Sequence, residues 1–408
     1  MLAQLEGSQA VAETVARCRP EVVAAYPISP QTHIVEGLAR MVQAGELTGC
    51  EYLNVESEFG AMSVCVGASA TGARTYTATA SQGLLYLVEA LYHAAGLGLP
   101  IVMTVANRAI GSPINIWNDH SDAMSQRDSG WIQLYAESNQ AAADLHVQAF
   151  ALAEELSLPV MVCMDGFVLT HAHERVDVPD AGQVDAFLPA FVPRQALDPA
   201  DPISIGAMVG PEAFFEVKYL MHHKQLAALE AIPRVGAEFA RAFGREGAGL
   251  VHPYRTEGAE TIVVALGSLL GTIEDVVDEL RDEGVAIGAL GVTCFRPWPI
   301  DAVREALAGA GTVVVVEKAF AVGAGGIVGQ NVRLALERQP VHVYDVIAGL
   351  GGRAVTAASL RRMLGEALEG RLDRMTFLDL KWDLVERELA RESGPSAENM
   401  LRDVGVVT

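Results

Sequence analysis

The sequence predicts an α/β protein built mainly on parallel sheets. Strand-length apolar segments alternate with amphipathic helical segments between residues 21 and 167, and the alternation returns from Thr261 onward. Half of the 408 residues are hydrophobic, a proportion that suits parallel strands buried on both faces. Because strands joined by helices pair in parallel, each of the two regions is expected to form an α/β unit.

The first unit begins with an apolar strand at 21–28 and a helix at 29–47, where Ile34, Leu38 and Met41 recur at helical spacing. Its other expected strands lie at 50–57, 74–80, 99–109 and 158–167, and its other helices at 58–73, 82–98 and 139–157. The helix at 58–73 is rich in Gly, Ala and Ser, which predicts close packing against its neighbours.

A proline-rich stretch at 176–211 interrupts the pattern, and such a run is expected to wrap over a surface or to reach a neighbouring chain. A polar helix at 212–235 and a connection at 243–260 follow it. The second unit has expected strands at 261–268, 285–292, 311–317 and 341–347, and helices at 272–284 and 300–310. We therefore expect domains at 1–250 and 251–365, followed by a helical tail at 366–408.

Composition and charge exclude several classes of protein. A net charge of −22 argues against nucleic-acid binding, which needs a basic surface. No apolar run is long enough to span a membrane, and the first residues lack the pattern of a secretory leader. The five cysteines show no C-x-x-C spacing, so neither a zinc site nor an iron–sulfur cluster is expected, and the thiols are expected to be buried and reduced. Together these features predict a cytoplasmic protein.

Three polar or glycine-rich motifs carry weak signals. The segment VGAGGIVG at 322–329 fails the dinucleotide fingerprint, because its sixth place is Val328, and it is expected to form a tight strand-to-helix turn. The pairs His222-His223 and His171-x-His173 have no evident third ligand, so they are interpreted as surface residues and no metal site is assigned. The polar loop at 118–128 either orders itself by internal hydrogen bonds or lines a site.

Ser29 is the first of three residues that could carry chemistry. It lies in YPISPQT, where Pro27 and Pro30 fix two φ angles and stiffen the loop that leaves the strand. Open α/β sheets bind ligands at the carboxyl ends of their strands, where this loop lies. Ser29 therefore presents its hydroxyl from a rigid loop at a position where a ligand could bind. A helix N-cap is the simpler interpretation, and the two roles are compatible.

The other two candidates follow neighbouring strands. In NVESEFGAM, Glu56 and Glu58 would share a face if extended, and either carboxylate could simply complement the helix dipole. Arg108 ends a wholly apolar strand. An arginine in this position usually pairs with an acidic side chain, and in a binding site the carboxylate of a substrate can take the place of that side chain.

Taken together and in this order, these segments resemble the alpha subunit of the multi-subunit 2-oxoacid:ferredoxin oxidoreductases, most closely those that act on pyruvate. AYPISPQT is similar to the family's Y-P-I-T-P-S motif and ESEFGAM to its S-E-x-G-A motif. NRAIGSPINIWNDHSDAMSQRDSGWIQLY resembles the family's long central signature, and LPVMVCMDGFVLTH, FGR and GLGGRAVT also match. The resemblance extends from about Ala10 to Thr356, and the central signature is long enough to be specific.

The resemblance implies a thiamine-diphosphate enzyme divided between chains. This chain would supply the pyrimidine-type domain, followed by a transketolase-C-terminal-like domain. By family analogy, Glu58 hydrogen-bonds the aminopyrimidine ring of the cofactor, Arg108 holds the substrate carboxylate, and Ser29 holds the carboxylate or carbonyl oxygen. The reaction implied is oxidative decarboxylation of pyruvate to acetyl-coenzyme A, with coenzyme A as co-substrate.

The resemblance also implies partners. A beta subunit would carry the diphosphate and Mg²⁺ sites, gamma- and delta-type subunits would carry iron–sulfur clusters, and ferredoxin would accept the electrons from what is expected to be a dimer of heteromers. The chain departs from the family at two positions, where Ser29 replaces the usual threonine and Gln31 a common serine. The lost methyl leaves the substrate open, so a branched or aromatic 2-oxoacid such as phenylglyoxylate, with another acceptor such as NAD, is an alternative. A non-catalytic scaffold is another alternative, which the presence of Ser29, Glu58 and Arg108 together disfavours. A transketolase-like carboligase is the last alternative, and the long central signature disfavours it.

Overall fold

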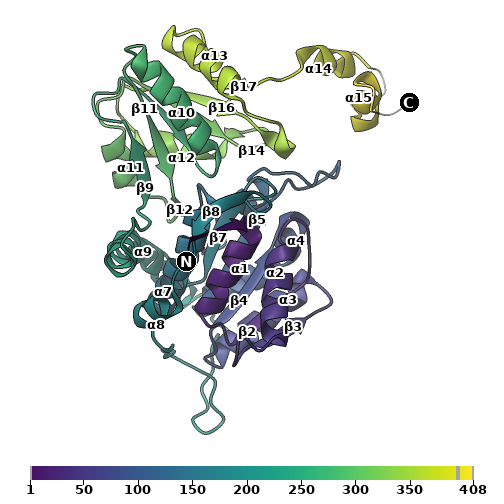
Figure 1. The fold of residues 1–408 in the computed structure, drawn as a ribbon, viewed down its shortest axis with the longest axis vertical. Helices are drawn as coiled ribbons and strands as arrows, with labels where there is room; N and C mark the ends of the chain where they lie inside the picture. The colour runs from purple at the N-terminus through teal and green to yellow at the C-terminus, as the bar shows by residue number, and fades with distance from the viewer. Residues whose placement is uncertain (1, 392–395, 407–408) are drawn as a thin grey trace.

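The computed structural model describes residues 2–391 and 396–406 of the chain. Two α/β units are stacked along the long axis of the molecule, each built on one twisted sheet with helices on both faces (Figure 1). The expected α/β class with mainly parallel sheets is confirmed. No helix in the described part is long and apolar enough to cross a membrane.

The first unit contains a seven-stranded sheet with the order β12-β6-β7-β5-β4-β2-β3. Its strands are β2 (Val22–Ala25), β3 (Glu51–Asn54), β4 (Thr75–Thr79), β5 (Ile101–Asn107), β6 (Ile132–Tyr135), β7 (Val160–Asp165) and β12 (Cys294–Arg296). All neighbours are parallel except β12, which runs antiparallel to β6. The central strand β5 is buried over its whole length, as its unbroken apolar sequence predicts.

Two groups of helices cover this sheet. One apolar core joins one face to α1 (Gly7–Arg17), α2 (Thr32–Gln43), α7 (Asn139–Leu156), α8 (Ala181–Phe187) and α9 (Phe214–Phe243). The other face packs against α3 (Glu58–Ala70), α4 (Ser81–Tyr86) and α5 (Val88–Leu97). The short helix α6 (Ser121–Ser125) follows β5 in the chain and contributes to the same core. The sequence patterns did not predict α1, nor the antiparallel pairing of β1 (Leu2–Glu6) with β8 (His173–Asp177).

The second unit has a six-stranded sheet with the order β17-β16-β13-β10-β11-β9. Its strands are β9 (Val251–Tyr254), β10 (Thr261–Ala265), β11 (Ile287–Val292), β13 (Thr312–Glu317), β16 (His342–Ile347) and β17 (Met375–Phe377), of which only β9 is antiparallel. Helices α10 (Leu269–Asp282) and α13 (Ala357–Leu368) cover one face, and α11 (Ile300–Ala306) and α12 (Ile327–Ala335) cover the other. The short 3-10 helix η1 (Leu350–Gly352) follows β16.

The glycine-rich segment 322–329 forms the turn that the sequence predicts. It follows β14 (Phe320–Ala321), contains β15 (Gly325–Gly326), which pairs with β14 in a hairpin, and runs directly into the start of α12. The backbone N–H groups of Ile327, Val328 and Gly329 donate to the carboxylate of Glu317 at 2.8, 2.8 and 3.0 Å. A carboxylate of the chain itself therefore fills the position at this helix N-terminus where a phosphate would bind.

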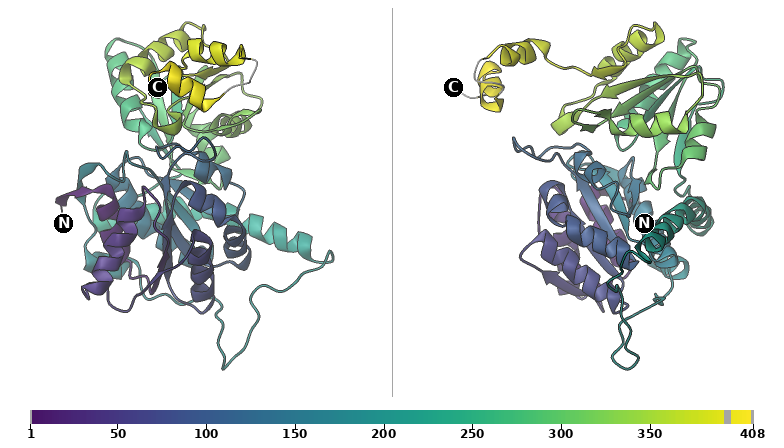
Figure 2. Two further views of the ribbon diagram at one scale, coloured as in Figure 1. Left: turned by 90° about the vertical axis from the view of Figure 1, so that its right-hand side faces the viewer. Right: turned by 180° about the vertical axis from the view of Figure 1, so that it is seen from behind.

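The segments outside the two units are extended. Most of residues 188–213 have no regular structure and, with the N-terminal part of α9, project from the first unit (Figure 2). The tail 366–408, expected to be helical, supplies β17 to the second sheet before α14 (Trp382–Leu389) and α15 (Ala397–Asp403). Residues 392–395 and 407–408 of that expected tail lie outside the described residues.

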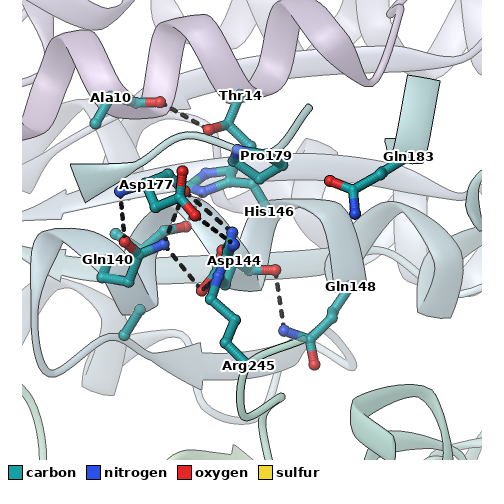
Figure 3. Close-up of polar contacts among 12 residues, drawn as sticks. Ala10, Thr14, Gln140, Asp144, His146, Gln148, Asp177, Pro179, Gln183 and Arg245 are labelled. Carbon is teal, nitrogen blue, oxygen red and sulfur yellow. Dashed lines mark hydrogen bonds and ion pairs between the residues drawn. The ribbon is translucent and has the colours of Figure 1, made fainter. Parts of the chain in front are cut away.

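Arg245 fixes the chain where it leaves the first unit (Figure 3). Its guanidinium donates to both carboxylate oxygens of Asp144 in α7, at 2.6 and 2.8 Å, and to the Oδ2 of Asp177 in β8 at 3.3 Å. Gln140 reinforces the group, donating to Asp144 at 3.0 Å and accepting from the Asp177 backbone N–H at 2.7 Å. This network gives the FGR segment a structural role at the connection between the units.

Candidate functional site

The three candidate residues lie at the carboxyl edge of the first sheet. Ser29 follows β2, Glu58 begins α3 after β3, and Arg108 follows β5. The carboxyl ends of parallel strands meet at one edge of a sheet, which is where open α/β sheets bind ligands. The topology therefore brings these three loops to a single edge.

Ser29 is exposed, and its hydroxyl makes no hydrogen bond to any residue that the structure describes. The expectation that it caps the following helix is wrong, because α2 begins at Thr32 and its N-cap is Gln31. The Gln31 side chain instead donates to the carbonyl of Tyr26 at 2.9 Å and closes the loop on itself. The serine hydroxyl therefore stays available to a ligand.

Arg108 is buried, with 8 % of its surface exposed. Its Nη1 donates to the Ser29 carbonyl at 2.8 Å and its Nε to the Asn115 carbonyl at 3.4 Å. Within residues 2–391 and 396–406, no carboxylate forms an ion pair with its guanidinium. Burial lowers the pKa of Arg108, with the charge of Asp122 opposing this. A buried guanidinium held only by carbonyl groups is suited to an anionic ligand.

Glu58 is buried at the first position of α3, where the Ser57 hydroxyl accepts a hydrogen bond from the Gly60 N–H at 3.0 Å and caps the helix. The Glu58 carboxylate makes no hydrogen bond to any described residue. It lies against Gly83 in α4, where a Cβ would come within 2.7 Å of Oε1. Glu56 is exposed, so the two carboxylates do not share a face as they would in an extended strand.

Asp122 organises the loops between these residues, and the sequence did not single it out. Its Oδ2 accepts from the backbone N–H groups of Ser81 and Arg108, both at 2.9 Å. Its Oδ1 accepts from Asn107 at 2.8 Å and from the Ala123 N–H at 2.7 Å. Burial raises the pKa of Asp122 to about 6 although these four donors favour the charged form. The polar loop at 118–128 therefore orders itself and also supports the edge of the sheet.

A second buried carboxylate joins the two units behind this edge. Asp165, the last residue of β7, accepts from Lys318 Nζ at 3.0 Å, from His120 Nε2 at 2.5 Å and from the Ser268 N–H at 3.2 Å. Lys318 and Ser268 belong to the second unit. Burial alone would raise the pKa of Asp165, but the charges of Lys318 and His120 hold it well below its usual range. The ion pair therefore ties the second unit to the carboxyl end of β7 in the first unit.

Comparison with protein families gives two matches that cover most of the chain. Residues 13–236 match the family described as "Pyruvate flavodoxin/ferredoxin oxidoreductase, thiamine diP-bdg", and residues 259–360 match "Pyruvate:ferredoxin oxidoreductase core domain II". The chain belongs to the pyruvate:ferredoxin oxidoreductase family. The resemblance inferred from the sequence motifs is thereby confirmed.

Relatives in this family are similar over nearly their full length. The chain is 45% identical over 392 residues to the pyruvate synthase subunit PorA of Methanosarcina barkeri, covering 93% of this chain and 97% of that protein. It is 43% identical over 386 residues to the PorA subunit of Thermotoga maritima, covering 92% and 97%. The ketoisovalerate oxidoreductase subunit VorA of Pyrococcus horikoshii is 37% identical over 390 residues, covering 94% and 98%.

Solved structures show the same fold for this oxidoreductase subunit. A 2-oxoglutarate:ferredoxin oxidoreductase from Magnetococcus marinus, with 2-oxoglutarate, coenzyme A and succinyl-CoA bound, superposes with a TM-score of 0.68 at 20% identity. That superposition covers 90% of this chain and 65% of the other. A split-gene transketolase superposes with a TM-score of 0.52 at 15% identity and covers 91% of this chain and 100% of the other.

Proposed function

We propose that the chain is the alpha-type subunit of a thiamine-diphosphate-dependent enzyme that oxidatively decarboxylates pyruvate, with coenzyme A accepting the acyl group and ferredoxin the electrons. The observation that carries the proposal is the buried Arg108 guanidinium, which meets no carboxylate of the described residues and lies beside the exposed Ser29. A 2-oxoacid presents a carboxylate and a carbonyl oxygen that match a guanidinium and a hydroxyl. Relatives named pyruvate synthase subunits support pyruvate as the substrate.

Glu58 is the residue that we propose to hold the cofactor. A buried carboxylate with no hydrogen-bond partner in the described chain fits a ring nitrogen that carries or shares a proton. Gly83 supports this assignment because a side chain there would enter the space beside the carboxylate. Thiamine diphosphate, when bound, supplies a carbon nucleophile and an electron sink for decarboxylation. Glu58 would orient the aminopyrimidine ring and exchange a proton with its nitrogen.

The substrate groups would be held by the other two residues. Arg108 would form charge-assisted hydrogen bonds to the carboxylate, and Ser29 would donate to the carboxylate or carbonyl oxygen. Asp122 holds the backbone N–H of Arg108, so it acts as a positioning residue without touching the substrate. The carboxylate bound in this way is the group that leaves as carbon dioxide, so the contact must orient it without preventing its release.

We assign the remaining functions to partner chains in the cytoplasm. A beta-type subunit would carry the diphosphate and Mg²⁺ sites, gamma- and delta-type subunits the iron–sulfur clusters, and the whole would form a dimer of heteromers. Two observations support this assignment. All five cysteines are buried and unpaired, and Tyr26, Ile114 and Trp117 expose 39%, 74% and 53% of their surfaces near the site. Exposed apolar side chains grouped in this way commonly mark protein interfaces.

A branched or aromatic 2-oxoacid is the second candidate substrate, with NAD as an alternative acceptor. Its support is the 37% identity to a ketoisovalerate oxidoreductase subunit and the smaller side chain of Ser29. A non-catalytic scaffold has less support, because a scaffold has no need of a buried Glu58 carboxylate and a buried Arg108 guanidinium that form no ion pair with any described residue.

The test uses the complex purified with its native partners. Glu58→Gln is expected to lower 2-oxoacid-dependent acceptor reduction by about 10²–10⁴-fold, the usual contribution of acid–base catalysis, while the complex still assembles. Glu56→Gln, an exposed carboxylate two positions earlier, is the matched control and should keep full activity. Undiminished activity in Glu58→Gln would refute the assigned role.

A substrate series on the same complex tests the substrate separately. The kcat/KM values for pyruvate, 2-oxoisovalerate and phenylglyoxylate are compared under anaerobic conditions with ferredoxin and with NAD. A value highest for pyruvate with ferredoxin supports the proposal. A higher value for another 2-oxoacid would overturn the substrate and leave the role of Glu58 standing.

A further inference from the structure

Two histidines and a glutamate from three separate segments meet beside the Ser29 loop. Glu6 ends β1, His33 is the second residue of α2, and His171 lies in the turn between β7 and β8. One potential ligand atom from each residue lies within 4.8 Å of the other two. His33 Nδ1 and Glu6 Oε1 are 2.6 Å apart, and the two imidazole rings are 4.8 Å apart between centroids.

The sequence could not indicate this group, because its members are far apart along the chain. The pair His171-x-His173 shows no third ligand in the sequence, so it is interpreted as a surface pair and no metal site is predicted there. In the fold, His173 is exposed on β8, where its backbone pairs with that of Glu6, and the partners of His171 are His33 and Glu6. The missing ligands come from the N-terminal strand and from the helix that follows Ser29.

The surroundings orient the group. His171 Nδ1 lies 2.8 Å from the Thr170 hydroxyl, and a hydrogen bond of this kind fixes which imidazole nitrogen is free to bind a metal. Phe167 packs against the His171 ring at 4.8 Å, and Trp117 packs against Phe167 at 4.9 Å.

We propose that Glu6, His33 and His171 form a binding site for a divalent transition-metal ion, with Zn²⁺ as the best match. Two imidazoles and one carboxylate are a donor set that Zn²⁺ accepts in protein sites with one open position. Ligand atoms around a four-coordinate zinc ion lie roughly 3.3–3.5 Å apart, as bond lengths of about 2.0–2.1 Å require. The present separations, from 2.6 Å between His33 Nδ1 and Glu6 Oε1 to at most 4.8 Å across the group, lie on either side of that spacing. The side chains of Glu6 and His33 are partly exposed, at 21% and 48%, which leaves them room to adjust.

A bound ion would connect the first turn of α2 to the turn after β7. His33 lies four residues after Ser29, and Phe167 links His171 to Trp117 in the loop after Arg108. The ion would therefore hold both loops that carry the proposed substrate-binding residues without touching the substrate itself. The proposal of a metal site rests on the three side chains alone and does not depend on the proposed enzymatic function.

The test measures Zn²⁺ uptake by the full-length chain after treatment with a chelator. Equilibrium dialysis should give one Zn²⁺ per wild-type chain, and thermal unfolding should shift upward with added Zn²⁺. His33→Ala and His171→Ala should each weaken binding by at least about 100-fold, the upper effect of losing a supporting group around a metal. Glu6→Gln, which keeps the shape of the side chain, should weaken it by about tenfold or more.

The variant His222→Ala/His223→Ala is the matched control. It also removes two imidazoles, from the exposed pair on α9, and it should keep wild-type uptake. Absence of stoichiometric uptake by the wild-type chain would overturn the proposal. Uptake that is unchanged in the Glu6, His33 and His171 variants, or that is lost in the control, would overturn it equally. Binding of Co²⁺, followed by visible absorption, provides a second measurement, in which intense bands from a four-coordinate ion should appear with the wild-type chain and be lost in the His33 and His171 variants.

Discussion

Gly83→Ala would displace the Glu58 carboxylate without changing its chemistry. A Cβ at position 83 would lie 2.6 Å from Thr79 Oγ1 and 2.7 Å from Glu58 Oε1. Ordinary carbon–oxygen contacts are about 3.4 Å or longer, so the carboxylate must move by about 0.7 Å or more. A misplacement of about 1 Å in an active site can cost 100-fold in rate. We therefore expect a loss of about 10–100-fold in kcat.

The assay is anaerobic, 2-oxoacid-dependent acceptor reduction by the purified complex, with denaturant unfolding of the same preparation. Gly67→Ala in α3 is the control, because no atom lies within 4 Å of a Cβ built there. It should keep full activity and gain up to about 1 kcal/mol in stability, as glycine replaced in a helix usually does. Equal activity of the two alanine variants would refute the reasoning that the space beside Glu58 is needed for catalysis.

Three further predictions concern Arg108, Asp122 and His252. Arg108→Ala should raise KM for the 2-oxoacid by roughly 10–100-fold, since hydrogen bonds to charged groups contribute about 1.5–3 kcal/mol, and an unchanged KM would contradict the carboxylate contact. Asp122→Asn places an amide N–H₂ against one of four converging donors and should lower the free energy of unfolding by about 1–3 kcal/mol in urea titrations; wild-type stability would exclude the supporting role. The hydrogen bond to Glu137 raises the pKa of His252 to about 9, so the stability it contributes is complete below pH ~6.5 and is lost as pH rises through about 9. His252 is 42% exposed, which limits the effect to about 1 kcal/mol or less, and His252→Gln should flatten the urea-measured stability between pH 6 and 10.

The sequence predicted the layers of the fold because its signals are local. An apolar segment such as 99–109 is a buried strand in any α/β arrangement, and its helical neighbours repeat apolar residues at helical spacing. The N-cap role of Ser29 failed because two prolines delay the start of the helix, and Gln31 takes the cap position. The local sequence pattern does not show how many residues a rigid loop occupies before the helix begins.

The supporting residues of the site could not be predicted in the same way. Asp122 acts through Ser81 and Arg108, which lie 41 and 14 positions away, and Lys318 reaches Asp165 across 153 positions. Such contacts depend on the order of strands in the sheet, which one sequence without relatives does not reveal. Glu58 and Arg108 stood out as charged residues next to apolar strands, and the family resemblance gave them roles. That neither forms an ion pair with a described residue is visible only in the fold.

Strand β12 has a consequence for how the chain folds. Residues 294–296 follow β11 of the second unit, yet they pair with β6 and complete the edge of the first sheet. During synthesis at about 5–20 residues per second, roughly 8–30 s separate the appearance of Tyr135 from that of Arg296. For that interval β6 is an open edge, the kind of surface that templates pairing with foreign strands. Until residues 294–296 emerge, the nascent chain therefore exposes a strand edge that can pair with other chains, and chaperones that bind nascent chains would act in that interval.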